Sequence, residues 1–107
     1  MAWTVVFLDE RVEAEMLDQP ADIRARFDHV KQLIAEHGPM LLPAKYVKHI
    51  DGQLWELRLK GRDGIARAFY VTATGQRLVI VRVFTKKTQK TPPREIKLAK
   101  DRAEEVE

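Results

Sequence analysis

The sequence has 107 residues, of which 45% are hydrophobic and 33% are charged. This balance is typical of one folded domain, and it excludes a disordered chain, a repeat array and a multidomain layout. The absence of cysteine excludes disulfides, thiolate metal sites and cysteine nucleophiles. We therefore expect a single domain over residues 1–107.

The net charge of +3 is unevenly distributed along the chain. Residues 1–40 hold 4 Lys/Arg against 8 Asp/Glu, residues 41–76 hold 6 against 3, and residues 77–102 hold 9 against 2. Three glutamates follow in the last five residues. This asymmetry predicts a basic surface for a polyanion on an otherwise acidic body. The alternative is a set of solvated cations that serve only solubility.

Apolar runs in this sequence are short. Leu78–Val81 is far below the roughly 20 residues that span a bilayer. The apolar start Trp3–Leu8 is followed at once by Asp9 and Glu10, which is not typical of a secretion signal. We expect a cytoplasmic protein with no membrane contact.

The first forty residues predict one strand and two helices. Trp3–Leu8 is β-branched and aromatic, as in a strand. Asp9–Leu17 predicts a short helix with three inward side chains: Val12, Met16 and Leu17. A longer helix begins with Pro20 as its first residue and stops at Gly38-Pro39. Its apolar stripe consists of Ile23, Phe27, Val30 and Ile34.

Alternating segments separated by turn residues predict a four-stranded antiparallel meander next. The strands are Lys45–Ile50, Gln53–Lys60, Ile65–Ala73 and Gln76–Lys86, with turns at Asp51-Gly52, Gly61–Gly64 and Thr74-Gly75. A terminal helix follows, with Thr91 as its cap and Pro92 as its first residue, and it turns Ile96, Ala99, Ala103 and Val106 inward. The fold class is thus α+β in the order β-α-α-β-β-β-β-α, with a mainly antiparallel sheet of four to five strands.

Two-residue turns would align basic residues across this sheet. Lys45 would face Arg58, Arg58 would face Arg67, and Arg67 would face Arg82. Like charges directly opposite are destabilising, so such a row indicates a site for phosphate. Lys86 and His49 share this face, and Glu56, diagonal to Arg67, could neutralise one charge. A one-residue bulge would break the row.

The two faces of the sheet are expected to differ. The face toward the helical hairpin is core and carries Trp55, Leu57, Leu59, Ala66, Ala68, Val79, Val81, Val83 and the two tyrosines Tyr46 and Tyr70. The basic face has an apolar lower half for the terminal helix, formed by Ile65, Phe69, Val71, Leu78, Ile80 and Phe84. Its upper half is expected to stay open as a basic floor.

A second basic concentration runs from the last strand into the terminal helix. It contains Lys86, Lys87, Lys90 and Arg94. Free N–H groups and the positive dipole at a helix start favour an anion. Together the basic floor of the sheet and this basic segment predict binding of single-stranded or distorted nucleic acid.

Cleavage of a phosphodiester needs a base and cations for the charge that develops on phosphate. Arg58, Arg67 and Arg82 suit the second role because the guanidinium fork matches two phosphate oxygens. Lys86 or Lys87 could be the base if neighbouring cations lower its pKa. No residues have metal-ligand spacing, so we expect no metal and no cofactor. A metal-independent cut would use the 2′-hydroxyl of RNA as nucleophile.

Three segments together resemble the RelE/HigB-type toxins of bacterial toxin–antitoxin systems, most closely their phage-derived HigB-like branch. They are Leu54–Arg58 (LWELR), Gly64–Tyr70 (GIARAFY) and Val83–Pro92 (VFTKKTQKTP), followed by a helix with Ala99 and Arg102. The resemblance covers roughly residues 40–104. It implies a compact RelE-like microbial ribonuclease-type fold.

The resemblance also implies a function. Such toxins are mRNA endoribonucleases that act in the ribosomal A site, inhibit translation and arrest growth. A cognate antitoxin, often a helix-turn-helix repressor, neutralises them. Carried over by position, Arg58 and Arg67 match the strand arginines that bind RNA and stabilise the transition state, and Lys86 and Lys87 match the basic end of the last strand.

One departure from the family pattern concerns proton transfer. Many relatives place a tyrosine or histidine near the C-terminal end, and neither follows Tyr70 here. Lys86, Lys87 and His49 are the substitutes. Lys45, His49, Arg82, Lys90 and Arg94 are the candidate RNA-binding residues. The alternative function is a non-catalytic RNA- or partner-binding module, such as a degenerate toxin.

Overall fold

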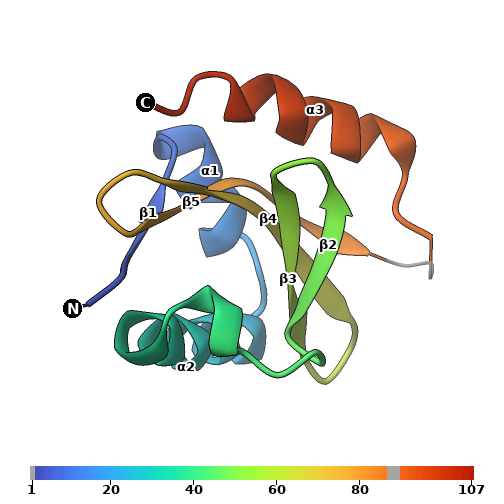
Figure 1. Ribbon diagram of the computed structural model, residues 1–107. Helices are drawn as coiled ribbons and strands as arrows, with labels where there is room; N and C mark the ends of the chain where they lie inside the picture. The colour runs from blue at the N-terminus through green and yellow to red at the C-terminus, as the bar shows by residue number, and fades with distance from the viewer. Residues whose placement is uncertain (1, 87–89) are drawn as a thin grey trace.

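The computed structural model describes residues 2–86 and 90–107, and there it places three helices around one five-stranded sheet (Figure 1). The elements in chain order are β1 (Thr4–Phe7), α1 (Glu10–Leu17), α2 (Ala21–His37), the 3-10 helix η1 (Pro39–Leu41), β2 (Val47–Asp51), β3 (Leu54–Lys60), β4 (Ile65–Ala73), β5 (Arg77–Lys86) and α3 (Pro93–Ala103). The predicted α+β class and element order are confirmed. No helix in this part of the chain is long and apolar enough to cross a membrane.

The strand order in the sheet is β1-β5-β4-β3-β2. The meander β2 to β5 is antiparallel throughout, as predicted, whereas β1 lies parallel to β5. The sheet is therefore mixed rather than purely antiparallel. The long connection through α1 and α2 is what permits the parallel pairing of β1, since a tight hairpin joins only antiparallel strands.

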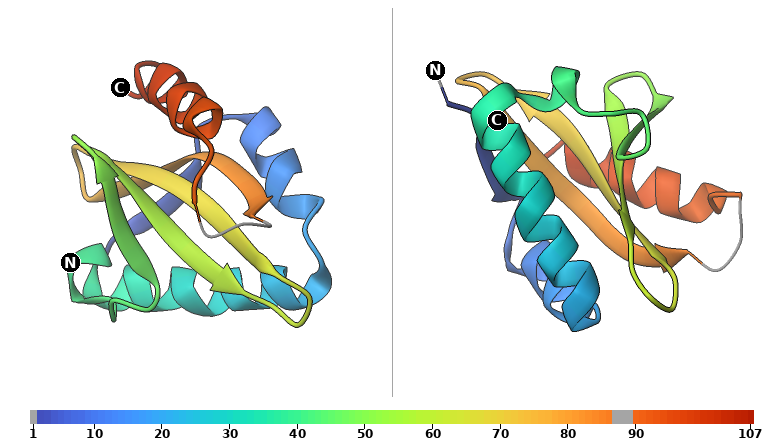
Figure 2. Two further views of the ribbon diagram at one scale, coloured as in Figure 1. Left: turned by 90° about the vertical axis from the view of Figure 1, so that its right-hand side faces the viewer. Right: turned by 90° about the horizontal axis from the view of Figure 1, so that it is seen from below.

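Each face of the sheet carries its own core, because α2 and α3 pack on opposite sides (Figure 2). The predicted stripe of α2 is fully buried. Under α3, Ala99 is buried, while Ile96, Ala103 and Val106 are partly buried against the second core, as expected. Leu17 is wrong as a core residue and is 62% exposed. Val12 and Met16 take the inward face of α1, and the residue after Met16 is turned away by the helical period.

Helix ends follow local chemistry. The Asp9 carboxylate accepts the Val12 N–H and caps α1, and Gly38 ends α2 with a φ of 78° that favours glycine. At the start of α3, the predicted cap Thr91 is wrong by one residue. Pro92 holds the cap position without a side-chain hydrogen bond, and Pro93 is the first helical residue.

The predicted strand registers are right for one hairpin. Arg58 of β3 pairs with Arg67 of β4, as the turn between these strands predicts. Arg67 pairs with Phe84 rather than Arg82, and Arg82 pairs with Phe69. The β4–β5 turn has three residues instead of two, because Ala73 pairs with Arg77, and the register shifts again after Phe69.

This second shift is a bulge in β5. Phe69 pairs with Arg82 but Tyr70 pairs with Ile80, which leaves Val81 unpaired. A bulge reverses the alternation of side chains beyond it. Val79 and Val81 accordingly belong to the core under α3, and Leu78 and Ile80 to the core under α2, opposite to the sequence prediction.

The β2–β3 hairpin is also shifted. Lys48 pairs with Glu56 and His49 with Trp55, so His49 lies on the opposite face from Arg58. Lys45 precedes β2 in a turn. The predicted row of four cations is therefore wrong, and of its pairs only Arg58 and Arg67 are direct partners across neighbouring strands.

The exposed edge of β5 beyond β1 is covered by side chains from two helices. Just after β1, the Leu8 N–H donates a hydrogen bond to the Ile80 carbonyl of β5. Farther along β5, the Val83 N–H donates to the Glu15 carboxylate at 3.0 Å. The next carbonyl, of Val81, accepts from Arg102 of α3 at 3.0 Å. Glu15 also pairs with Arg82 and Arg102, each at 2.9 Å. One carboxylate of α1 thus joins the sheet edge to α3.

We expect Glu15→Ala to lower the free energy of unfolding by about 2–3 kcal/mol, because it removes charged hydrogen bonds and leaves the buried Arg102 without its carboxylate. Chemical denaturation measures this loss. Glu13→Ala, on the exposed side of the same helix, is the matched control. Equal stability of the two variants would contradict this role.

Tyr70 gives the structure a pH dependence at the alkaline end. Burial raises the pKa of Tyr70 to about 12, whereas the pKa of a tyrosine in an unfolded chain is about 10. Stability from Tyr70 is therefore complete below the unfolded pKa and is lost as the pH rises toward about 12. Ultraviolet titration of tyrosinate should show a late component that Tyr70→Phe removes. Superimposable titration curves would contradict the assignment.

Candidate functional site

A buried carboxylate lies between two arginines on the face that α3 partly covers. The Glu56 Oε2 atom is 3.3 Å from Arg58 Nε and 3.6 Å from Arg67 Nη1. The side chain of Glu56 is 1% exposed, that of Arg67 is 8% exposed and that of Arg58 is 36% exposed. The three residues, called here the β3–β4 cluster, come from directly adjacent strands. The cluster therefore reaches solvent mainly through Arg58.

The electrostatics of the β3–β4 cluster favour an anion. Burial lowers the pKa of Arg67, nearby Arg58 lowers it further, and Glu56 partly compensates. Because the ordinary pKa of arginine is so high, Arg67 stays charged at neutral pH despite this lowering. Two cations share one carboxylate, so the cluster keeps one positive charge in excess.

Hydrogen bonding in the cluster is incomplete. Glu56 Oε1 and the Nε and Nη1 atoms of Arg67 are buried and have no hydrogen-bond partner within the described residues. An unmet buried polar group costs about 1–3 kcal/mol. The contact between Arg67 Nη1 and Glu56 is an ion pair longer than a hydrogen bond. Glu56 therefore does not saturate Arg67, and the buried charge of Arg67 is left to act on an anion near Arg58.

Arg82 is held differently. Its guanidinium donates to both oxygens of Glu95 in α3, at 2.8 and 3.1 Å, and pairs with Glu15. The hydrogen bonds to Glu95 are the main cause of its raised pKa. It also lies 5.7 Å from the centre of the Phe84 ring. Arg82 is diagonal to Arg67, as their partners show, but two carboxylates offset its charge.

The side chains of two other predicted site residues contact groups outside the β3–β4 cluster. Lys45 is exposed over the ring of Tyr46. His49 is exposed on the other face, with Nε2 at 2.7 Å from the Gly52 carbonyl and its ring against Trp55. His49 therefore does not face Arg58 and Arg67, whereas Lys45 adjoins Tyr46, whose carbonyl accepts the Arg58 N–H at 2.8 Å.

The second basic concentration lies around the end of β5 and the start of α3. Lys86 is the last residue of β5 and pairs with Ile65. Arg94 is exposed in the first turn of α3, and Lys90 is exposed just before it. Lys87 lies outside the described residues.

Sequence reasoning missed two lysines on the cluster's face. Lys48 pairs with Glu56 across β2 and β3, and Lys60 lies two residues beyond Arg58. Both are exposed. The alternation of β3 could have placed Lys60, whereas Lys48 required the correct β2–β3 register.

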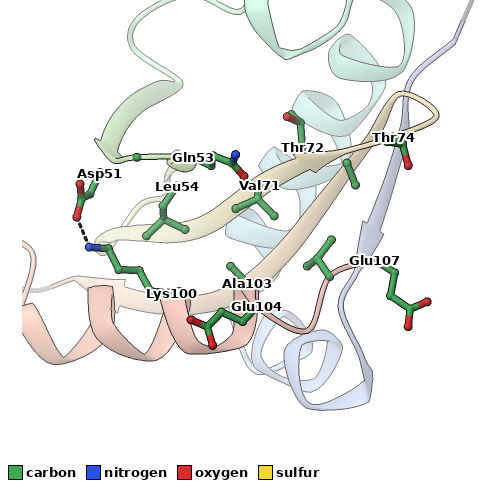
Figure 3. A pocket seen from close by; sticks show the side chains of 13 residues that line it. Asp51, Gln53, Leu54, Val71, Thr72, Thr74, Lys100, Ala103, Glu104 and Glu107 are labelled. Atoms are coloured by element: carbon green, nitrogen blue, oxygen red, sulfur yellow. Dashed lines mark hydrogen bonds and ion pairs between the residues drawn. The ribbon is translucent and has the colours of Figure 1, made fainter.

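A groove of about 570 Å³ lies at the other end of α3, between that helix and the β2–β3 turn (Figure 3). Its floor includes Leu54 and Val71. Acidic side chains stand at its rim, and Lys100 there is paired with Asp51. This rim repels phosphate, so the groove does not extend the cationic site. The described part of the chain also contains no group of three or more His, Asp or Glu that could hold a metal ion.

Comparison with known proteins places the chain in a family. The family described as "Phage derived protein Gp49-like (DUF891)" matches residues 14–104. No curated protein matches the sequence. Among solved structures, a chain in the crystal structure of the archaeal RelE–RelB complex from Pyrococcus horikoshii OT3 has a TM-score of 0.60 at 18% identity. The alignment covers 81% of this chain and 98% of that one.

The archaeal match confirms the predicted RelE-like fold, and the family match covers most of the chain, including both arginine strands. The resemblance to RelE/HigB-type toxins is confirmed at this level. The chain belongs to the phage-derived Gp49-like family.

Proposed function

We propose that this protein is the toxin of a type II toxin–antitoxin system and an endoribonuclease that cleaves mRNA on the ribosome. The observation that carries the proposal is the pair Arg58 and Arg67, opposite each other on adjacent strands, in which two buried nitrogens of Arg67 have no partner in the described part of the chain. Family membership and the RelE-like fold support the same assignment.

Arg58 is the group of the cluster that contacts phosphate. It is the more exposed arginine, and a guanidinium fork binds two nonbridging oxygens at once. Arg67 lies behind it and adds positive charge from a site of low solvent access, where electrostatic stabilisation is stronger than in water. Lys48 and Lys60, exposed on the same face, guide the RNA backbone.

The chemistry needs only the RNA and protein side chains. The 2′-oxygen attacks the adjacent phosphorus, its proton passes to a base, and the bond to the 5′-oxygen breaks as that oxygen gains a proton. The products are a 2′,3′-cyclic phosphate and a 5′-hydroxyl. The proposed base is Lys86, the last residue of β5, or Lys87, which follows it in the sequence.

Lys90 and Arg94 extend the RNA path to the start of α3, where backbone N–H groups face an anion favourably. Arg82 contributes to RNA binding less than Arg58, because Glu15 and Glu95 already neutralise it. The proposed partners are the ribosome with its mRNA and a cognate antitoxin of helix-turn-helix type. The archaeal relative is itself described in complex with RelB.

We expect Arg58→Ala to lower the cleavage rate by about 100- to 1,000-fold, the usual cost of removing one donor to transition-state charge. Arg67→Ala should lower it by at least about 10-fold. Growth after induction and mapping of new 5′ ends in transcripts measure both effects. Lys97→Ala removes an exposed cation of α3, outside the β3–β4 cluster, and is the control.

Two outcomes would contradict the proposal in different ways. Wild-type protein that arrests growth without creating new 5′ ends would indicate a non-catalytic binding module. If Arg58→Ala protein cleaves as well as wild type, the activity stands but the active site does not lie at the β3–β4 cluster.

A further inference from the structure

We propose that Glu56 is a positioning residue that fixes the guanidinium groups of Arg58 and Arg67 for the reaction. This inference rests on the proposed function and assigns a role to the one acidic member of the β3–β4 cluster. Glu56 acts through the arginines and does not itself touch the RNA.

The burial of Glu56 argues for this indirect role. Only 1% of its side chain is exposed, so a 2′-hydroxyl cannot approach it closely enough for proton transfer. Glu56 is therefore no substitute for the lysines as general base.

Burying a carboxylate destabilises the fold unless neighbouring groups replace the hydrogen bonds and favourable charge interactions it had in water. Here the compensation is poor, because Glu56 Oε1 has no hydrogen-bond partner in the described structure and both ion pairs are long, at 3.3 and 3.6 Å. An apolar residue would suit the strand better, since the flanking Leu54 and the opposite Phe69 belong to the core under α3. A stability role alone does not explain a glutamate here.

The contact with Arg58 shows what the carboxylate accomplishes. Glu56 accepts a hydrogen bond from Nε of Arg58 and from no other atom of that group in the described structure. Holding Nε leaves both terminal nitrogens of the fork available for two phosphate oxygens. Without Glu56, repulsion from Arg67 directly opposite would turn the half-exposed Arg58 toward solvent.

Two substitutions separate the charge of Glu56 from its position. Glu56→Gln keeps the shape but removes the negative charge, so RNA should bind as well or better while kcat falls by about 10- to 100-fold, the usual result of misplacing a catalytic group. Glu56→Asp keeps the charge but is one methylene shorter and cannot reach both arginines. It should lower kcat similarly with KM near the wild-type value.

The assay is cleavage of mRNA on programmed ribosomes, with binding of a short single-stranded RNA measured separately. Glu105→Gln, which alters an exposed ion pair with Arg11, is the matched control and should change neither quantity. Thermal unfolding identifies any variant that does not fold. If Glu56→Gln fails to fold, Glu56→Asp, which retains the charge, decides the question.

A double-substitution cycle gives the readout that a purely structural role would not move. In an Arg58→Ala background, Glu56→Gln should cost less than about 3-fold, because the arginine that Glu56 hydrogen-bonds is already absent and only the longer ion pair with Arg67 is left. Wild-type kcat in folded Glu56→Gln protein, or full additivity with Arg58→Ala, would overturn the inference. Absence of cleavage by the wild-type protein would instead overturn the proposed function.

Discussion

The Glu15 carboxylate is the contact on which the arrangement of this molecule depends. β1 is only four residues long, so the outer edge of β5 is uncovered beyond Ile80. Glu15 accepts the Val83 N–H at this edge and binds Arg102, which in turn donates to the Val81 carbonyl. An open strand edge invites unwanted pairing. The same contacts that cover it also fix α3 across the sheet.

The molecule uses two carboxylates in contrasting ways. Around Glu15 the contacts are near 2.9 Å, and Arg82 is satisfied on two sides. Around Glu56 the ion pairs are longer, and three buried polar atoms have no partner among the described residues, whereas around Glu15 only Arg102 Nε is in that position. Departures from good polar satisfaction concentrate at functional sites, where they are offset elsewhere in the fold. The first cluster therefore maintains structure, and the second is the better candidate for binding phosphate.

The sequence predicted the elements well because helix and strand periods are local properties. The inward stripe of α2 and the pairing of Arg58 with Arg67 follow from spacing and from one turn of the expected length. The prediction for the rest of the basic row was wrong, because each turn or bulge of unexpected length shifts the register of every residue pair beyond it. One added turn residue and the unpaired Val81 moved Arg82 from Arg67 to Phe69. Neither event has a sequence signal as strong as the Asp-Gly turn that suggested the row. The importance of Glu15 was not predicted, since its partners lie far along the chain.

The proposed function requires that the RNA backbone bind at Arg58 and Arg67. The most direct measurement is nuclear magnetic resonance of the arginine Nε–H groups during titration with a single-stranded RNA that carries a 2′-deoxy sugar at its cleavage position. We expect saturable shifts of the Arg58 and Arg67 signals at one common affinity, with the Arg102 signal unchanged because Glu15 and the Val81 carbonyl hold the Nη1 atom of that buried guanidinium. Binding that shifts other signals and leaves those of Arg58 and Arg67 unchanged would show that the RNA binds at another surface.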